Sequence, residues 1–431
     1  MELILDLHIH SLYSRATSKD MNIESLYKWG KIKGVNIIGT GDFTHPEWFR
    51  QLREKLEPAE SGLFKLKEEY AKEIDNKLPN SIKNNLMRFI LTVEISNIYS
   101  KYEKVRKVHH LVLAPSFEVV SEINFRLNKI GNLNADGRPI LGLDSKDLLK
   151  NILAASSDAY LIPAHIWTPW FSMFGSKSGF DSIEETFEEL SEYIFAIETG
   201  LSSDPYMNWR LSQLDGITLL SHSDAHSPAK LGREADIVNC DLSYFEILDA
   251  IKKGDERFIG TIEFFPEGGK YHYDGHRLCN IRLEPNETKK YNGICPKCGK
   301  PLVIGVLNRV EQLADRPSNF KPEKHKTVEY IIPLVEILAE IKGVKSPNSN
   351  IIQSAYERIY SNLGTEFDIL RKIKIEDIKD SSINELSLAI SKLRKGNVYT
   401  EPGYDGVYGV IKVFKNKNEL KKSTGQVGMN I

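Results

Sequence analysis

Short apolar runs recur along the first 260 or so residues, and each ends in polar residues before an amphipathic segment begins. The segments Ile23–Ile32, Ser116–Ile130 and Ser145–Ala155 have the apolar spacing of helices. Buried strands that alternate with helices predict an α/β fold, and this many repeats favour a sheet closed into a barrel. The predicted strands are Leu3–Leu7, Val35–Gly39, Phe89–Val93, Tyr160–Pro163, Ile194–Ile197 and Ile217–Leu220.

The first predicted strand leads directly into two histidines, His8 and His10. Residues two apart on a strand point to the same side, so both imidazoles should face one site. Convergent nitrogen and oxygen donors of this kind hold divalent metals. The alternative is a strand that simply ends in polar residues.

The other predicted strands end in the same way. In β/α barrels the carboxyl ends of the strands meet at one rim, where active sites are built. Buried carboxylates cost several kcal/mol unless they are paired or coordinated, so core packing does not explain this pattern. The residues concerned are Asp42, His45, Glu94, His165, Glu198, His222, Asp224 and His226.

The pair His109-His110 precedes its apolar run, Leu111–Ala114, instead of following it. The polar segment Ser100–Lys107 before it predicts an antiparallel hairpin with the strand that carries Glu94. That hairpin would bring His110 to Glu94. The sequence therefore predicts a cluster of divalent metal ions at this rim.

A second metal site is predicted from two pairs of ligands, each with a gap of two residues: His276 with Cys279, and Cys295 with Cys298. Each pair can turn tightly and bind one metal, as in structural zinc sites. His272 is the alternative to His276 as the fourth ligand. We expect one structural zinc ion that stabilises a small β element at Tyr271–Leu307.

Composition sets the remaining bounds. The chain has 431 residues, 41% of them hydrophobic and 27% charged, with a net charge of −2. No apolar run is long enough to span a membrane. The first residues do not have the pattern of a secretory signal, because the acidic residues Glu2 and Asp6 interrupt the apolar run. We expect a cytoplasmic protein without a membrane partner.

The C-terminal third reads as mainly helical, with helices predicted at Asn308–Arg316, Thr327–Ile341, Ile351–Asn362 and Ser382–Arg394. Basic residues gather at Lys321–Lys326, Arg371–Lys374, Lys392–Lys395 and Lys412–Lys422. Each cluster alone is typical of solvated surface, but together they can form a face that binds a phosphate backbone. The tail Gln426–Ile431 begins like a sliding-clamp peptide but lacks the aromatic pair, so a sliding clamp is an alternative partner only.

Several strings of the sequence resemble the polymerase-and-histidinol-phosphatase (PHP) domain, and more closely the endonuclease Q family of DNA repair nucleases. The strings are DLHIHSLYSRATSKD, GTGDFTHPEW, TVEIS, HHLVLAPS, IPAHIWTPW and SHSDAH, continued by GHRLC, CPKCGKPL, LNRVEQLADRP and PGYDGVYGVI. The resemblance covers most of the chain. It implies a PHP-type distorted (β/α)7 barrel, a small zinc-binding element and a mainly helical C-terminal domain.

The resemblance also implies the site. A cluster of up to three ions, Zn, Mn or Mg, is expected on His8, His10, Glu94, His110, His165, Asp224 and His226. Either Asp42 or His45 joins it, because this chain lacks the usual adjacent Asp-His. Glu94, Asp224 and His226 are the candidate catalytic residues. Arg15 is a candidate phosphate contact, and Trp167 and Trp170 are candidate base contacts, with core packing as the alternative for both tryptophans.

We therefore expect a metal-dependent DNA repair endonuclease. By resemblance, it would cut on the 5′ side of deaminated bases (uracil, hypoxanthine, xanthine) or abasic sites. Residues 1–265 would form the barrel, 266–310 the zinc-binding element and 311–431 the helical DNA-binding region. The alternatives are a PHP phosphoesterase for a small phosphate ester and a non-catalytic nucleic-acid-binding protein. A small ester explains neither the zinc element nor the long C-terminal third.

Overall fold

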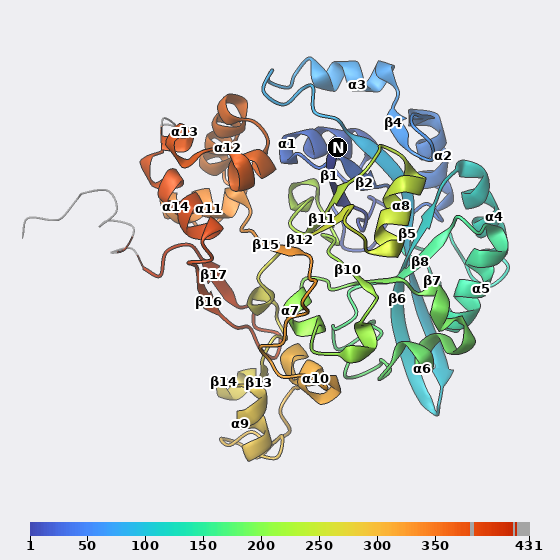
Figure 1. The fold of residues 1–431 in the computed structure, drawn as a ribbon, viewed down its shortest axis with the longest axis vertical. Helices are drawn as coiled ribbons and strands as arrows, with labels where there is room; N and C mark the ends of the chain where they lie inside the picture. Colours follow the sequence, from blue (N-terminus) through green and yellow to red (C-terminus); the bar gives the residue numbers. More distant parts are fainter. Residues whose placement is uncertain (380–382, 417–418, 420–431) are drawn as a thin grey trace, which may run out of the picture.

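In the computed structural model, which describes residues 1–379, 383–416 and 419, a strongly curved sheet is surrounded by helices (Figure 1). β1 (Glu2–Asp6) runs parallel to β2 (Ile37–Gly39), which runs parallel to β5 (Arg88–Lys101). β5 forms a long antiparallel hairpin with β6 (Lys104–Ala114), and β6 pairs with β8 (Tyr160–Pro163). The predicted α/β fold class is confirmed.

The remaining strands of the barrel form a separate pair and extend the main sheet on its other side. β9 (Ala196–Glu198) and β10 (Thr218–Leu220) form a parallel pair. On the other side of β1, β11 (Ala235–Asn239) and β12 (Phe258–Glu263) pair antiparallel. Short peripheral strands are β3 (Leu56–Pro58), β4 (Phe64–Leu66) and β7 (Ile140–Leu141).

Alternation along the strands divides the core into two parts. One set of apolar side chains fills the inside of the curved sheet, including Leu3, Leu5, Leu7, Ile90, Leu111 and Ile162, all fully buried. The alternate positions face the outer helices, as period-two geometry requires. The helices around the sheet are α1 (Ile23–Lys33), α2 (Pro46–Lys55), α3 (Glu68–Asp75), α4 (Phe117–Leu127), α5 (Ser145–Ala155), α6 (Ile183–Phe187), α7 (Pro205–Asn208) and α8 (Tyr244–Lys253).

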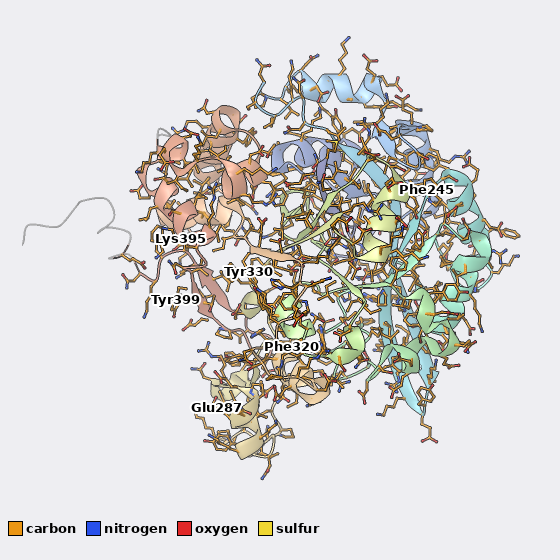
Figure 2. All side chains as sticks on the ribbon, viewed as in Figure 1. Phe245, Glu287, Phe320, Tyr330, Lys395 and Tyr399 are labelled. Carbon is orange, nitrogen blue, oxygen red and sulfur yellow. The ribbon has the colours of Figure 1, made fainter. Side chains whose placement is uncertain are left out.

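The element that the sequence predicts to bind zinc, here called the zinc-binding element, projects from the barrel at the bottom of Figure 1. It consists of β13 (Asp274–His276), β14 (Ile281–Leu283) and α9 (Pro285–Lys290), and α10 (Val306–Leu313) follows it. The hairpin of β16 (Tyr399–Glu401) and β17 (Val410–Lys412) leads toward it from the C-terminal helices. Figure 2 shows Glu287 on α9 within this projection and Tyr399 at the start of β16.

The segment Thr327–Ile341 corrects one prediction. Its first residues form β15 (Thr327–Tyr330), which pairs parallel with β12, and the helix α11 (Leu334–Lys342) begins only after Pro333. A proline disfavours helical backbone in the residue before it, and β12 offers an open edge for pairing. Tyr330 then stacks on Phe265 with ring centroids 5.0 Å apart and donates a 2.5 Å hydrogen bond to Asp204 (Figure 2).

The C-terminal helices α11, α12 (Asn350–Leu363), α13 (Ile375–Lys379) and α14 (Asn384–Arg394) gather beside α1 (Figure 1). Lys33 of α1 forms a buried 2.7 Å ion pair with Glu366 at this contact. Arg371 and Lys372 pair with Glu329 and Glu2, so this predicted basic cluster is largely neutralised.

The tail that begins like a sliding-clamp peptide, residues 426–431, lies outside the described residues. None of the described helices combines the length and apolarity that a bilayer crossing requires.

Two buried glutamates face each other across β11 and β12. Glu263 ends β12, and Glu234 precedes β11 at the neighbouring register position. Both side chains are fully buried. Burial raises the pKa of Glu234 well above its usual value, and the nearby carboxyl of Glu263 raises it further. Burial likewise raises the pKa of Glu263, and the hydroxyls of Thr261 and Ser221 offset this only in part.

We predict that the stability of the Glu263→Gln variant falls less with rising pH than the stability of the wild type. A carboxyl with a raised folded pKa stabilises the fold fully below its unfolded pKa and loses that contribution as pH rises toward the folded pKa. The wild-type free energy of unfolding should therefore fall by up to about 1.4 kcal/mol per pH unit per retained proton above about pH 4.5. Between about pH 5 and pH 8, the thermal unfolding midpoint of Glu263→Gln should therefore change less with pH than the midpoint of the wild type.

The matched control is Glu323→Gln, which removes an exposed glutamate. Its pH slope should equal that of the wild type. Equal slopes in all three proteins would contradict a protonated buried pair.

Candidate metal centre

Four side chains meet where β1 and β10 end, beside the middle of β5. His8 and His10 follow β1, Glu94 lies in β5, and Asp224 follows β10, and one donor atom of each lies within 4.8 Å of the others. The Nε2 atom of His10 is 3.2 Å from Glu94 Oε2 and 3.1 Å from Asp224 Oδ1. The Nε2 atom of His8 is 3.6 Å from Glu94 Oε2. These donors surround a space suited to one cation.

A second group uses the other oxygen of Glu94. His109 Nδ1 lies 2.5 Å and His165 Nε2 lies 2.9 Å from Glu94 Oε1, and the three residues form a second set of donor atoms within 4.8 Å. One fully buried carboxylate is thus shared between two sets of imidazoles. This is the arrangement by which a carboxylate bridges two metal ions.

The donor set fits divalent cations. His8 Nε2 is buried and has no hydrogen-bond partner among the described residues, although it points at the cluster. Imidazole nitrogens and carboxylate oxygens are ligands of zinc, manganese and related ions. Burial alone would raise the pKa of Glu94, but His109, Arg138 and His8 hold it well below its usual value, so Glu94 is a carboxylate.

The predicted ligand His110 does not reach this cluster, and His109 takes the place expected for it. In the hairpin, Ser96 lies opposite His109 and Ile95 opposite His110, so His109 shares the inner face with Glu94. His110 points outward, where its Nε2 forms a 2.8 Å hydrogen bond with Ser145 of α5. Burial lowers the pKa of His110 to about 3. A shift of one residue in register exchanges the two faces, and the sequence alone does not fix that register.

Neither residue of the second motif joins either donor group. Asp42 is fully buried; its Oδ1 lies 3.3 Å from His10 Nδ1, and its Oδ2 accepts hydrogen bonds from Ser11 and Ser14. Asp42 therefore orients His10. The His45 ring stacks on Tyr13 with ring centroids 4.3 Å apart.

His226 lies against the cluster but outside both donor groups, with its ring centroid 4.4 Å from that of His10. The backbone is strained at three residues around the cluster. Asp42, His165 and Asp224 have φ values of 50°, 32° and 47°, in a region that costs about 1–3 kcal/mol for such residues. Gly200, itself at φ 65°, makes room for His165, since a Cβ there would lie 2.5 Å from His165 Cβ. The surrounding fold holds these loops in place for the site.

A buried chain of carboxylates and imidazoles supports His8 from behind. His8 Nδ1 lies 2.8 Å from Glu198 Oε2, Glu198 Oε1 lies 2.7 Å from His222 Nδ1, and His222 Nε2 lies 3.0 Å from Asp236 Oδ2. Burial lowers the pKa of His222, but Asp236 and Glu198 outweigh it and raise that pKa to about 10. Such a chain fixes which nitrogen of His8 faces the metal. The sequence indicated the support of His8 by Glu198 only through the position of Glu198 directly after a predicted strand.

A cavity of about 420 Å³ opens over the cluster. Arg138 lines it and forms a 2.9 Å ion pair with Glu94, which the sequence did not indicate. Trp170, 41% exposed, stands at its edge, and Arg15 lines it while pairing with Asp136. Trp167 is instead a core residue, fully buried, with its indole N–H donated to Asn208. A larger cavity of about 540 Å³ near Trp209 shares no lining residue with this one.

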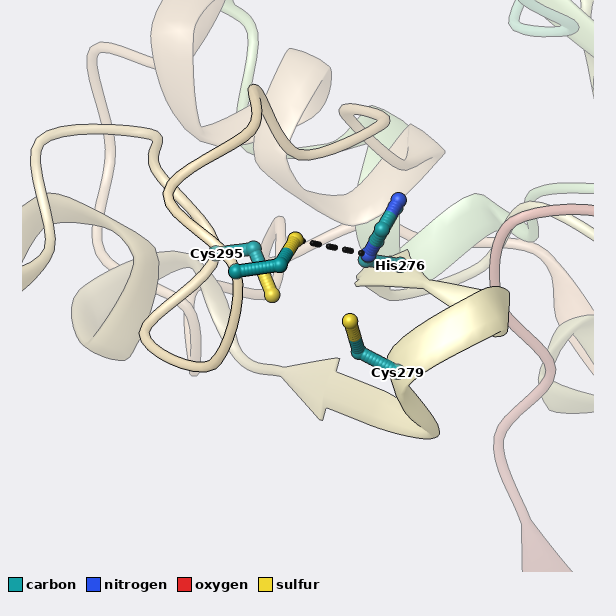
Figure 3. A group of neighbouring side chains, drawn as sticks. His276, Cys279 and Cys295 are labelled. Carbon is teal, nitrogen blue, oxygen red and sulfur yellow. Dashed lines mark hydrogen bonds between the residues drawn. The ribbon is translucent and has the colours of Figure 1, made fainter.

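The second predicted site is also assembled. Figure 3 shows His276, Cys279 and Cys295 converging from β13, the turn after it and the knuckle loop. The donor atoms of His276, Cys279, Cys295 and Cys298 lie within 4.8 Å of one another, with Cys298 Sγ 3.5 Å from His276 Nδ1. His272 is buried beside Tyr273 and is not in this group. The buried apolar cluster here is small: it consists of Leu283, Cys295 and Leu302, with Cys279 and Ile281 packed against it. The four donors are therefore placed where a bound metal would add stability to the element.

We predict that His109 and His110 differ sharply in their effect on bound metal. His109→Gln should remove about one barrel metal ion per chain, because it deletes one of three donors of the second group. His110→Gln should retain the wild-type stoichiometry, because its ring faces α5. Elemental analysis of both purified proteins checks this, with circular dichroism to confirm folding. Metal loss in His110→Gln but not in His109→Gln would contradict the register of the hairpin.

We also predict that Glu198→Gln weakens metal binding at the barrel by about 10–100-fold, the usual cost of losing such an orienting carboxylate. Competition with a zinc or manganese chelator measures the affinity. Glu263→Gln, a change at another buried glutamate that touches none of the donors, is the control. Unchanged affinity in Glu198→Gln would show that His8 needs no orienting partner.

Comparisons with known proteins agree with this geometry. The sequence model of the MJ0043 C-terminal domain matches residues 333–397. The uncharacterized protein MJ0043 of Methanocaldococcus jannaschii is 34% identical over 265 residues, which cover 59% of this chain but only 32% of that protein.

Two solved structures are similar over nearly the whole chain. The lesion-specific endonuclease PfuEndoQ of Pyrococcus furiosus is 29% identical with a TM-score of 0.82, and the similarity covers 100% of both chains. An endonuclease Q solved with a 27-mer duplex carrying an abasic lesion at its active site is 30% identical with a TM-score of 0.81, covering 96% of this chain and 97% of that one. The chain therefore belongs to the endonuclease Q family and is an endonuclease.

Proposed function

We propose that this endonuclease is a metal-dependent DNA repair enzyme that cuts the phosphodiester on the 5′ side of a damaged nucleotide. The observation that carries the proposal is the buried carboxylate of Glu94, shared by two donor groups on the floor of an open cavity. Similarity to an endonuclease Q solved with a lesion-containing duplex supports DNA as the substrate. The proposed lesions are abasic sites and deaminated bases, namely uracil, hypoxanthine and xanthine.

In this proposal His8, His10, Glu94 and Asp224 would hold one ion, and Glu94, His109 and His165 would hold a second. His226 lies beside His10 and is a candidate for a further ligand. Zinc, manganese or magnesium ions bound there would lower the pKa of water and neutralise negative charge on the phosphate. Water attacks phosphorus, the bond to the 3′ oxygen breaks, and the products carry a 3′-hydroxyl and a 5′-phosphate.

Arg138 is the residue that we propose to contact the scissile phosphate. It is planar, permanently charged and placed between Glu94 and the open cavity, and a guanidinium can donate two hydrogen bonds to phosphate oxygens. Arg15 projects from the cavity edge with 79% of its side chain exposed, so it suits a flanking phosphate. Both cations compensate charge that DNA brings to an already acidic site.

The cavity also suits an extruded nucleotide. Its volume of about 420 Å³ lies within the range of small-molecule pockets, and Trp170 offers an aromatic face at its edge. Damaged and mispaired nucleotides cost least to unstack, which favours them over normal ones. Residues 1–265 supply this site, while the zinc-binding element (266–310) and the helical region (311–431) extend the surface for a duplex.

The second candidate is a phosphoesterase for a small ester, since the same metal-ligand set can hydrolyse phosphomonoesters. The cavity is large enough for such a substrate. The zinc-binding element and the C-terminal helices have no role in that case, whereas a duplex needs a long binding surface.

We predict metal-dependent nicking of a labelled duplex that carries one deoxyuridine, deoxyinosine or abasic site, and no nicking of the normal duplex or in chelator. Asp224→Asn should lower the rate by about 100-fold or more while DNA binding is retained, because it removes one donor of the first group. Gel analysis of the nick and of the shifted complex checks both. Turnover of a phosphate monoester with no cut in any duplex would favour the small-ester reaction instead.

A further inference from the structure

The zinc-binding turn presents one leucine almost entirely to solvent. Leu278 is 83% exposed, more than any other large apolar side chain in the described part of the chain. It stands in the 3₁₀ turn Arg277–Cys279, between the zinc-site residues His276 and Cys279. Exposing a leucine to water is unfavourable, and its place between two metal-site residues makes the exposure a fixed feature of the turn.

Contacts from the C-terminal segment hold the turn rigid. The backbone N–H of Arg277 donates a 2.7 Å hydrogen bond to Asp405, and the hydroxyl of Tyr404 donates one of 2.7 Å to Asn280. Tyr404 also packs against Gly275 of β13, where a Cβ would come within 2.4 Å of its ring. The turn that contains Leu278 is thus held in place by contacts with Tyr404 and Asp405 and by the residues of the second metal site.

The surroundings of Leu278 are basic. Arg277 precedes it, and Lys297 of the knuckle loop reaches to within 3.5 Å of the Cys279 carbonyl oxygen. Arg282 and Lys300 are also exposed on the same element. None of these four cations has a carboxylate within ion-pair distance among the described residues. An apolar tip set among unpaired cations suits a polyanion with an apolar interior.

The element is joined to the rim of the metal-lined cavity. The Tyr271 ring lies 6.0 Å from that of Trp170, which lines the cavity. Next to Tyr271, the Lys270 ammonium lies 4.5 Å from the centre of the Tyr408 ring, which is 67% exposed. A duplex bound at the cavity would therefore meet basic and aromatic side chains that continue onto the zinc-binding element.

We propose that Leu278 is a wedge that enters the base stack of bound duplex DNA, while Arg277 and Lys297 hold phosphates on either side. Proteins that kink DNA insert apolar side chains between base steps in this way, and the flanking cations offset the cost of unstacking. The bend would ease extrusion of the damaged nucleotide into the cavity. This inference rests on the proposed DNA substrate.

The test compares full-length Leu278→Ser with Ile351→Ser, which removes a 65% exposed aliphatic side chain from α12. In the Asp224→Asn background, energy transfer between dyes at the two ends of a lesion duplex reports bending without cleavage. Leu278→Ser should reduce the bend and slow nicking of the lesion duplex by about 10-fold. Nicking of the same lesion in a single strand should be unchanged, because nothing there needs unstacking from a partner strand. Both variants should retain wild-type zinc content.

An unchanged bend and an unchanged ratio of duplex to single-strand nicking would overturn the wedge and leave the patch as a protein-docking surface. A bend that depends on Leu278 in a wild-type protein that nicks no DNA would support the wedge and reject the proposed reaction. Absence of any DNA binding by the wild type would overturn both.

Discussion

The structure depends on the burial of one carboxylate, that of Glu94, among imidazoles. A fully buried carboxylate costs several kcal/mol unless cations surround it, and Glu94 has His8, His10, His109, His165 and Arg138 within ion-pair distance. These groups come from separate elements of the barrel and meet only when the sheet curves. The strained backbone at Asp42, His165 and Asp224 is maintained because the same closure fixes it.

Outward from Glu94, two of the imidazoles, those of His10 and His8, are each held by a further carboxylate. Asp42 orients His10, and Glu198 orients His8 with support from His222 and Asp236. The pair Glu234 and Glu263 shows the opposite solution on the neighbouring strands. Burial raises the pKa of both carboxyls, and the charge of Arg233 offsets this only in part for Glu234, so the pair avoids the cost of buried charge by retaining protons. Burying a carboxyl group thus has two outcomes in this barrel. Its pKa is lowered where several basic groups contact it, as at Glu94, and raised where burial outweighs them, as at Glu234 and Glu263.

The peripheral parts of this endonuclease Q protein are stabilised by different means. The element at the second site has only a small apolar core, and four residues that could hold a metal ion lie within it. The C-terminal helices pack their own apolar faces and join α1 through Lys33 and Glu366. The active-site cavity is of modest volume. The small element beside it and the C-terminal helices beside the barrel together extend the surface of the enzyme.

The sequence by itself determined the α/β class, the strand ends that carry ligands and the three cysteines of the second site, while His276 and His272 both remained candidates for its fourth ligand. These follow from local rules, since alternation along one strand and the spacing of ligand pairs need no knowledge of distant segments. Only the tertiary structure decided which of His109 and His110 faces Glu94, that Asp42 orients His10 and joins neither donor group, and that Trp167 is buried. It also decided that Thr327–Tyr330 pairs with β12 as a strand. In each case the outcome depends on strand register or on packing between segments far apart in the chain, and a one-residue shift in register turns a ligand away from its site.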